Sequence, residues 1–259
     1  MWAGAKMGDD GQVIEWGFVL VLAAVAMGAV AQRVTGMGFA LLAVPFLVLA
    51  VGPVQGVVLT NWCGVMSSGV NLIGVRRDVQ WRRIALITFA AVLGSIPGAL
   101  LIMVIPLNWL GIVVGSLTLL ALLVSLRSPA GSRKDTRGLR ASIGFASGFM
   151  GVTAGVSGPP MVIYRKATDW PMRAFASSVQ FHFMIVGITA VTLKWGEGPA
   201  YSVWHWVGLV LALALGSFAG SRLAPMVPNR TALRLVMIIA FAGTLMTIGR
   251  AAYNLLIGA

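Results

Sequence analysis

Two glycine-rich motifs interrupt apolar stretches of this chain, one in each half. The first is TGMGFALLAVP (residues 35–45), and the second, a weaker echo, is AGVSGPPMVIY (residues 154–164). A break of this kind inside a membrane exposes backbone N–H and C=O groups, which is tolerated only where protein or a solvated site surrounds them. Paired breaks in equivalent positions are typical of the substrate site of a repeat-built membrane protein. The motifs therefore predict a buried site where the two breaks meet.

The composition places these motifs in a membrane. Hydrophobic residues make up 58% of the 259 residues and charged residues only 10%, and a membrane-spanning helix needs about 20 apolar residues. We therefore predict a single all-α polytopic membrane domain over residues 1–259. Full-length spans are expected near 54–75, 84–105, 108–126, 172–193, 203–224 and 231–253.

The remaining apolar segments form two pairs, each split by one of the motifs. They cover residues 13–31 with 36–51, and 141–154 with 158–166. We expect each pair to form a broken-helix hairpin, which gives about ten helical segments in all. The arm that begins at Gly158 meets Arg165 too soon to cross a bilayer; whether the other arms span fully stays open.

A repeat relates the two halves. Pro53 and Pro171 are 118 residues apart, and GSIPG (94–98) precedes GSFAG (216–220) by 122. The near-constant spacing predicts a first repeat over 13–126, a linker over 127–139 and a second repeat over 140–253. Since each repeat holds an odd number of segments, five, the two must insert in opposite directions.

Basic residues cluster between the apolar segments, which indicates membrane topology rather than nucleic-acid binding, although the net charge is +12. If the basic linker 127–139 is cytoplasmic, the basic loop 76–83 and the basic residues at 165–173 and 222–230 share its face. Both termini are then external. The single cysteine, Cys63, excludes an internal disulfide, and its isolation argues against a metal cluster. No nucleotide-binding loop is present, and no cofactor is expected.

The second motif predicts a helix that begins at the break. Pro159 and Pro160 suit a first helical turn, and Ser157 is a candidate N-cap. Thr35 and Gly38 offer the same role in the first motif. With inverted halves, two helix N-termini, each carrying about half a positive charge, would meet and form a site for a small anion. The alternative is that the glycines only permit close helix packing or a kink.

The distribution of charged residues agrees with an anionic or neutral substrate, because none of the six full-length spans contains Asp or Glu. Arg33, just before the first motif, either pairs with the anion or extends to the cytoplasmic interface. Asn61 and Gln180 are further candidates for the binding shell, although such side chains also join helices to one another. His182 could carry a proton, or it is a structural core histidine.

An enzymatic alternative is a serine protease site: residues 155–158 fit the GxSG pattern of rhomboid-type intramembrane serine proteases, with His182 as the base. Three features weaken it. The first motif has no serine, two prolines follow Ser157 directly, and an inverted repeat has no evident use in a protease.

The motifs TGMGFALLAVP and ASGFMGVTAGVSGPPMVIY, each followed by a proline-led helix, resemble those of the TauE/SafE family of sulfite-exporter-like permeases over about residues 15–250. The resemblance implies an inner-membrane secondary transporter or facilitator, not an enzyme, for sulfite, an organosulfonate or a related anion. A passive anion channel stays an alternative. The partners would be this anion and the lipid bilayer, and a homo-oligomer stays open. The expected substrate-binding residues are Arg33, Thr35, Gly36, Gly38, Asn61, Gly155, Ser157, Gly158, Gln180 and His182.

Overall fold

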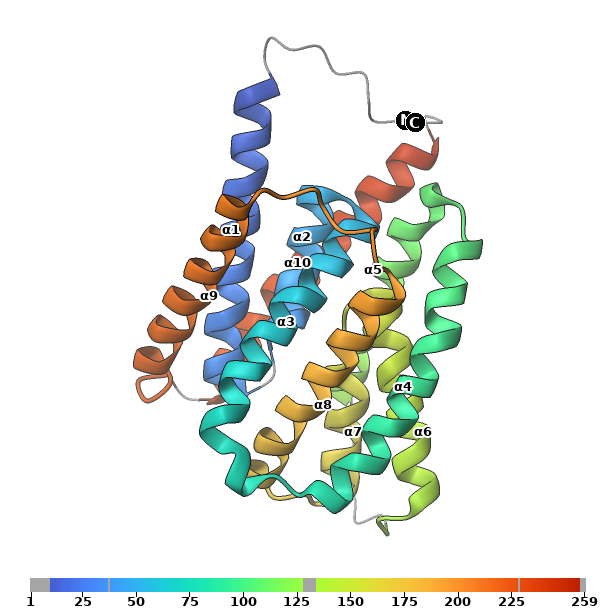
Figure 1. Ribbon diagram of the computed structural model, residues 1–259, viewed down its shortest axis with the longest axis vertical. Helices are drawn as coiled ribbons and strands as arrows, with labels where there is room; N and C mark the ends of the chain where they lie inside the picture. Colours follow the sequence, from blue (N-terminus) through green and yellow to red (C-terminus); the bar gives the residue numbers. More distant parts are fainter. Residues whose placement is uncertain (1–9, 37, 128–133, 228, 257–259) are drawn as a thin grey trace.

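The protein is a bundle of α-helices (Figure 1). The computed structural model describes residues 10–36, 38–127, 134–227 and 229–256, so the centre of the linker and Met37 of the first motif lie outside the described residues. The described part contains ten α-helices and one 3-10 helix. In chain order they are α1 (Asp10–Thr35), α2 (Phe39–Val51), α3 (Pro53–Val75), η1 (Arg76–Asp78), α4 (Trp81–Val104), α5 (Leu107–Arg127), α6 (Arg137–Ala154), α7 (Gly158–Ala167), α8 (Met172–Leu193), α9 (Val203–Leu223) and α10 (Asn229–Leu256).

Six helices in the described ranges are long and apolar enough to cross a membrane, namely α1, α3, α4, α8, α9 and α10. Helix α7 has ten residues and is therefore only about 15 Å long, half of a bilayer core. The expectation for the first hairpin was wrong in one respect: its entering arm does not end at residue 31. It continues to Thr35 as part of a 26-residue helix.

The outer faces of several helices are apolar and exposed. On α9 they include Leu211, Leu215 and Phe218, and on α10 Ile238 and Leu245. Such surfaces would be a liability in water, whereas in a bilayer they meet acyl chains. The exposed residues therefore fit the membrane environment that the composition predicts.

Two helix pairs approach so closely that only glycine fits between them. A side chain at Gly94 or Gly98 of α4 would meet the backbone of Phe145 or Phe149 in α6. Likewise, Gly216 and Gly220 of α9 lie against the backbone of α1. Small residues four apart on one helix face allow this backbone approach in membranes. The matching motifs GSIPG and GSFAG thus have matching packing roles.

The charged connections gather at one end of the bundle. In Figure 1, η1, residues 134–136 and the α7–α8 connection lie at the lower end, whereas the α4–α5 turn and the α8–α9 connection lie at the upper end. We call the lower one the basic end. Charged residues of the described ranges there include Arg76, Arg77, Arg82, Arg83, Lys134, Arg137, Arg140, Arg165, Lys166 and Arg173, whereas Lys194 and Glu197 follow α8 at the opposite end.

Candidate functional site

A small cavity lies where the two helix breaks meet. Its volume is about 40 Å³, which is room for about three waters or one small ion. The first hairpin contributes one wall and the second hairpin the other, with α3 and α8 between them. The lining residues are Gln32, Phe39, Ala40, Leu41, Thr60, Asn61, Gly64, Ser68, Gly155, Val156, Ser157, Gly158, Phe183 and Gly187.

The second break is a left-handed turn at the end of α6. Gly155 has φ of 73° and its N–H donates to the Gly151 carbonyl, a helix ending that favours glycine. Helix α7 then begins at Gly158 with two prolines in its first turn. Ser157 occupies the N-cap position, but its side chain makes no capping hydrogen bond. The N-terminus of α7 is therefore open to the cavity.

The first break is built differently. Helix α1 runs to Thr35, whose hydroxyl donates to the Ala31 carbonyl at 2.7 Å, and Gly36 turns the chain with φ of 86°. Helix α2 starts after Gly38, which is its N-cap. Of the two expected N-cap residues, Gly38 therefore occupies that position, whereas Thr35 closes α1 and does not cap α2. The first three residues of α2, Phe39 to Leu41, all line the cavity.

Three buried polar side chains lie beside the cavity. Gln32 of α1 donates from Nε2 to Oε1 of Gln180 on α8 at 3.3 Å, and Ser67 of α3 donates to Oε1 of Gln32 at 2.6 Å. Gln32 itself lines the cavity. The trio joins three helices through side-chain amides and a hydroxyl.

His182 lies behind the second break rather than in the cavity lining. The imidazole is fully buried, with Nδ1 3.1 Å from the Thr88 hydroxyl and Nε2 2.8 Å from the Ser147 hydroxyl. Ser147 in turn donates to the carbonyl of Ser157 at 2.6 Å. His182 is therefore linked to the break through Ser147.

The carbonyl groups at the end of α6 receive donors from other helices. Asn61 of α3 donates from Nδ2 to Val57 O at 2.9 Å and to Gly151 O at 3.3 Å. Lys194, buried at the end of α8, donates from Nζ to Val152 O. A helix that ends inside a bilayer needs such partners for its last carbonyls. A cation at that position also suits the negative end of the helix dipole.

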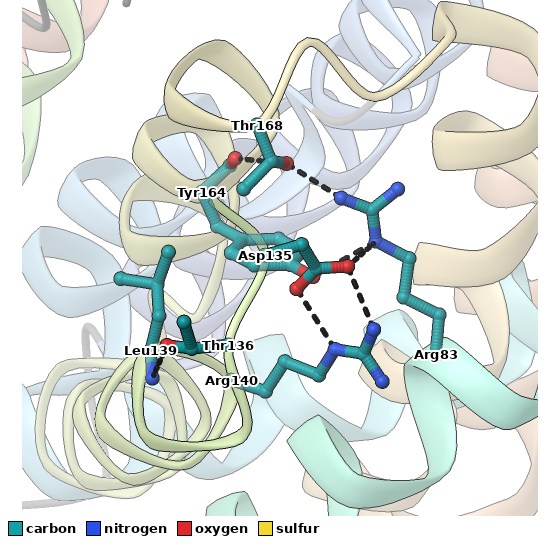
Figure 2. Close-up of polar contacts among 7 residues, drawn as sticks. All are labelled: Arg83, Asp135, Thr136, Leu139, Arg140, Tyr164 and Thr168. Atoms are coloured by element: carbon teal, nitrogen blue, oxygen red, sulfur yellow. Dashed lines mark hydrogen bonds and ion pairs between the residues drawn. The ribbon is translucent and has the colours of Figure 1, made fainter. Parts of the chain in front are cut away.

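A second polar cluster lies at the basic end (Figure 2). Asp135 accepts two hydrogen bonds from Arg140, at 2.9 and 2.7 Å, and one from the Tyr164 hydroxyl at 2.6 Å. Arg83 of α4 donates to Tyr164 and Thr168 and pairs with Asp135. The hydrogen bonds from Arg140 hold the pKa of Asp135 below its ordinary value, although partial burial opposes this effect. The cluster ties α4, α6 and α7 together.

The structure brings only some of the expected site residues together. Asn61, Gly155, Ser157 and Gly158 line the cavity, and Gln180 contacts it through Gln32. Arg33 is exposed and packs against Gly220 of α9. Thr35, Gly36 and Gly38 shape the first break without lining the cavity.

Sequence reasoning missed Gln32, Gly64 and the first turn of α2 as lining residues. The available signal was Gln32 itself, a polar residue four positions before Gly36. It was overlooked because the helix was expected to end at residue 31.

The protease alternative lacks its catalytic pair. Both ring nitrogens of His182 bind hydroxyls other than that of Ser157, so His182 is not placed to activate Ser157 as a base.

Comparison with known proteins found one family. Residues 20–247 match the family model described as sulfite exporter TauE/SafE. No significant match was found among curated proteins or among solved structures.

Proposed function

Since the chain belongs to the TauE/SafE sulfite exporter family and is thus a multi-pass membrane transporter, not an enzyme, we propose that it carries a small sulfur-containing anion across the inner membrane. The anion would be sulfite or an organosulfonate, and it would pass through the cavity between the two breaks. The observation that carries the proposal is that the first turn of α2 and the first residue of α7, Gly158, both line this cavity. Helix N-termini present free N–H groups and a positive partial charge, which suit an anion.

The charge of the site favours a singly charged guest. None of the lining residues, all within the described ranges, carries an ionisable side chain. Each helix N-terminus contributes about half of a positive charge, so that two together balance about one negative charge. A site of this kind therefore prefers the singly protonated form of sulfite, or a sulfonate, to a doubly charged anion.

Several hydrogen-bond donors remain for the guest. Within α2 the first backbone bond of the helix runs from Leu42 N to Gly38 O, so the N–H groups of Phe39, Ala40 and Leu41 have no partner inside the helix. In α7 Gly158 carries an N–H and the next two residues are prolines. Among the described residues, the hydroxyls of Ser68 and Ser157 make no side-chain hydrogen bond to the protein, and both residues line the cavity.

The inverted repeat is part of the proposal. Chain direction alternates from helix to helix in Figure 1, so helices five apart run in opposite directions. Packing partners are also exchanged between the two halves: α1 of the first half packs on α9 of the second, and α6 of the second half packs on α4 of the first. Both observations support two inverted repeats, over residues 13–126 and 140–253, with the linker 127–139 between them.

We place the basic end in the cytoplasm, by the positive-inside rule, and both termini outside. Cysteine labelling tests this orientation in a Cys63→Ala background. Glu197→Cys, at an exposed position of the α8–α9 connection, should react with an impermeant maleimide from outside the cell. Arg77→Cys, exposed at the basic end, should react only in inside-out vesicles. The reverse pattern would overturn the orientation.

Uptake into proteoliposomes tests the substrate. Labelled sulfite and labelled taurine are offered with and without a pH gradient. Flux of either anion supports the proposal, and a response to the gradient separates a coupled transporter from a passive channel. Flux of a cation, with neither anion carried, would overturn it.

One pair of variants ties the flux to the cavity. Gly64 lines the cavity and has open space beside it, and Gly74 lies farther along α3 with equally open space but outside the lining. Gly64→Leu should fill the cavity and abolish flux, while Gly74→Leu should leave flux near normal. Full flux in Gly64→Leu would mean that the anion passes elsewhere.

A further inference from the structure

The exchange of packing partners between the two sequence halves groups the helices into two bundles that do not coincide with those halves. In the first bundle α1 packs on α2, α9 and α10, and α2 packs on α3 and α10. In the second bundle α4 packs on α6 and α8, and α7 packs on α5, α6 and α8. The first bundle is thus α1–α3 with α9 and α10, and the second is α4–α8. The boundary is itself a packed interface: α3 packs on α8, and α5 on α10, more extensively than any of these four helices packs on a helix of its own bundle.

The cavity lies on the boundary between the bundles. Gln32, residues 39–41 and the lining residues of α3 belong to the first bundle. Residues 155–158, Phe183 and Gly187 belong to the second bundle. Relative motion of the two bundles would therefore open or close the cavity, whereas motion within one bundle would not.

Among the α-helices of the described ranges, two buried side-chain hydrogen bonds cross this boundary. Gln32 of α1 donates to Gln180 of α8, and Asn61 of α3 donates to the Gly151 carbonyl of α6. They lie at different depths. On α3, Asn61 precedes Ser67, the partner of Gln32, by six residues (67 − 61). On α8, Gln180 precedes Val186, which packs against Gly151, also by six (186 − 180). Six residues correspond to about 9 Å along a helix.

The cavity lies beside both bonds, since Gln32 and Asn61 both line it. Helix α3 descends toward the basic end in Figure 1 and α8 ascends from it. The Gln32–Gln180 bond is therefore on the basic side, and the Asn61–Gly151 bond is on the opposite side.

We propose that the first bundle (α1–α3 with α9 and α10) and the second bundle (α4–α8) move relative to each other as two rigid bodies. The Gln32–Gln180 hydrogen bond, held by Ser67, is the gate on the basic side. The Asn61–Gly151 hydrogen bond is the gate on the opposite side. The proposal rests on the transport function proposed above and adds what moves and which bonds break. In the present conformation both of these hydrogen bonds are formed. Breaking the glutamine bond opens the cavity to the basic end only.

The Asp135 cluster, although more conspicuous, does not cross the boundary. Arg83, Arg140, Tyr164 and Thr168 all belong to the second bundle (Figure 2). Its bonds hold α4, α6 and α7 together as one body. The cluster therefore stabilises the second bundle, and the bond that breaks on the basic side is the weaker, neutral hydrogen bond between Gln32 and Gln180.

Accessibility of a cysteine in the cavity tests the gate without any substrate. Ser68→Cys, which replaces a lining residue, is made in the Cys63→Ala background, and an impermeant maleimide is applied to either face of membrane vesicles. Adding Gln180→Leu should raise the alkylation rate from the basic face about three- to ten-fold, the effect of losing one neutral hydrogen bond. The rate from the opposite face should not rise. Asn61→Leu should give the reciprocal pattern.

The control is a buried bond of the same kind inside one bundle. Thr247 of α10 donates to the Pro45 carbonyl of α2 at 3.2 Å, and Thr247→Val should change neither rate. If Gln180→Leu does not insert stably, Ser67→Ala loosens the same gate by removing the donor to Gln32 and should raise the basic-face rate. Equal rates in the gate variants and Thr247→Val, or an equal rise from both faces, would overturn the proposal. A protein that shows the one-sided rise but moves no sulfite would contradict the transport function and leave the gate standing.

Discussion

Among single residues, His182 has the most restrictive surroundings. The Ser157 carbonyl can only accept, so Ser147 must donate its one hydroxyl proton there. Ser147 therefore accepts from His182 Nε2–H, whereas the bond between Nδ1 and the Thr88 hydroxyl satisfies either direction. The three bonds therefore require a proton on Nε2, in the neutral ring or in the imidazolium, and exclude the neutral ring with its proton on Nδ1. The ring thus positions the carbonyl of the second break rather than contacting the anion.

Two substitutions of His182 separate positioning from proton coupling. His182→Ala should lower stability by about 2–4 kcal/mol, through a cavity and unpaired hydroxyls, measured by thermal unfolding in detergent. His182→Gln keeps a donor and an acceptor and should recover much of that loss. Uptake by His182→Gln should still respond to a pH gradient in the same way as the unsubstituted protein. A gradient response lost in both variants would identify His182 as the proton carrier instead.

At the scale of helices, the residues that begin and end each element made most bounds predictable. Pro53 and Pro171 mark the starts of α3 and α8 because proline is favoured there and disfavoured farther in. The end of α1 was misplaced because Gln32 and Arg33 look like the start of a loop. Arg33 reaches an exposed surface and Gln32 finds partners on α3 and α8. Only the tertiary structure supplies those partners.

The Asp135 cluster holds the basic ends of α4, α6 and α7, and its strength should depend on pH. Asp135 has a lowered pKa in the folded protein, so its contribution is complete above the unfolded value of about 3.9. The contribution is lost as the pH falls through the lower, folded value. Asp135→Asn should therefore cost about 1–2 kcal/mol between pH 5 and 7.

The unfolding temperatures of Asp135→Asn and the unsubstituted protein should begin to converge as the pH falls below about 3.9, the unfolded aspartate value, and should meet only below the lower pKa of the folded protein. Asp78→Asn is the control, because its partner Arg173 is 84% exposed and such pairs contribute little. A penalty that stays constant down to pH 3, or an equal penalty in Asp78→Asn, would contradict this account.

For the whole molecule, the sequence predicts two halves but not the exchange of helices between them. The spacing of GSIPG and GSFAG shows that α4 and α9 carry the same small-residue face. A small-residue face permits close packing against any suitable partner, so it does not tell which helix fills it. The same limit applies to the cavity: the two motifs predict a meeting of helix ends, whereas Gln32 and Gly64 become lining residues only once α1 and α3 pack together.

Gly94 of α4 and Gly216 of α9 occupy matched positions in the two bundles, and both should be sensitive to substitution. A methyl group at Gly94 would meet the Phe145 carbonyl of α6, and one at Gly216 would meet the Ala26 carbonyl of α1. Gly94→Ala and Gly216→Ala should therefore each cost about 1–3 kcal/mol through overpacking, seen as less folded protein after heating in detergent. Gly249→Ala in α10 has open space and should be neutral or slightly stabilising. Because both helix pairs, α4 with α6 and α9 with α1, rely on such glycine contacts, both variants should lose stability. A loss confined to one of them would mean that the two pairs are not equivalent.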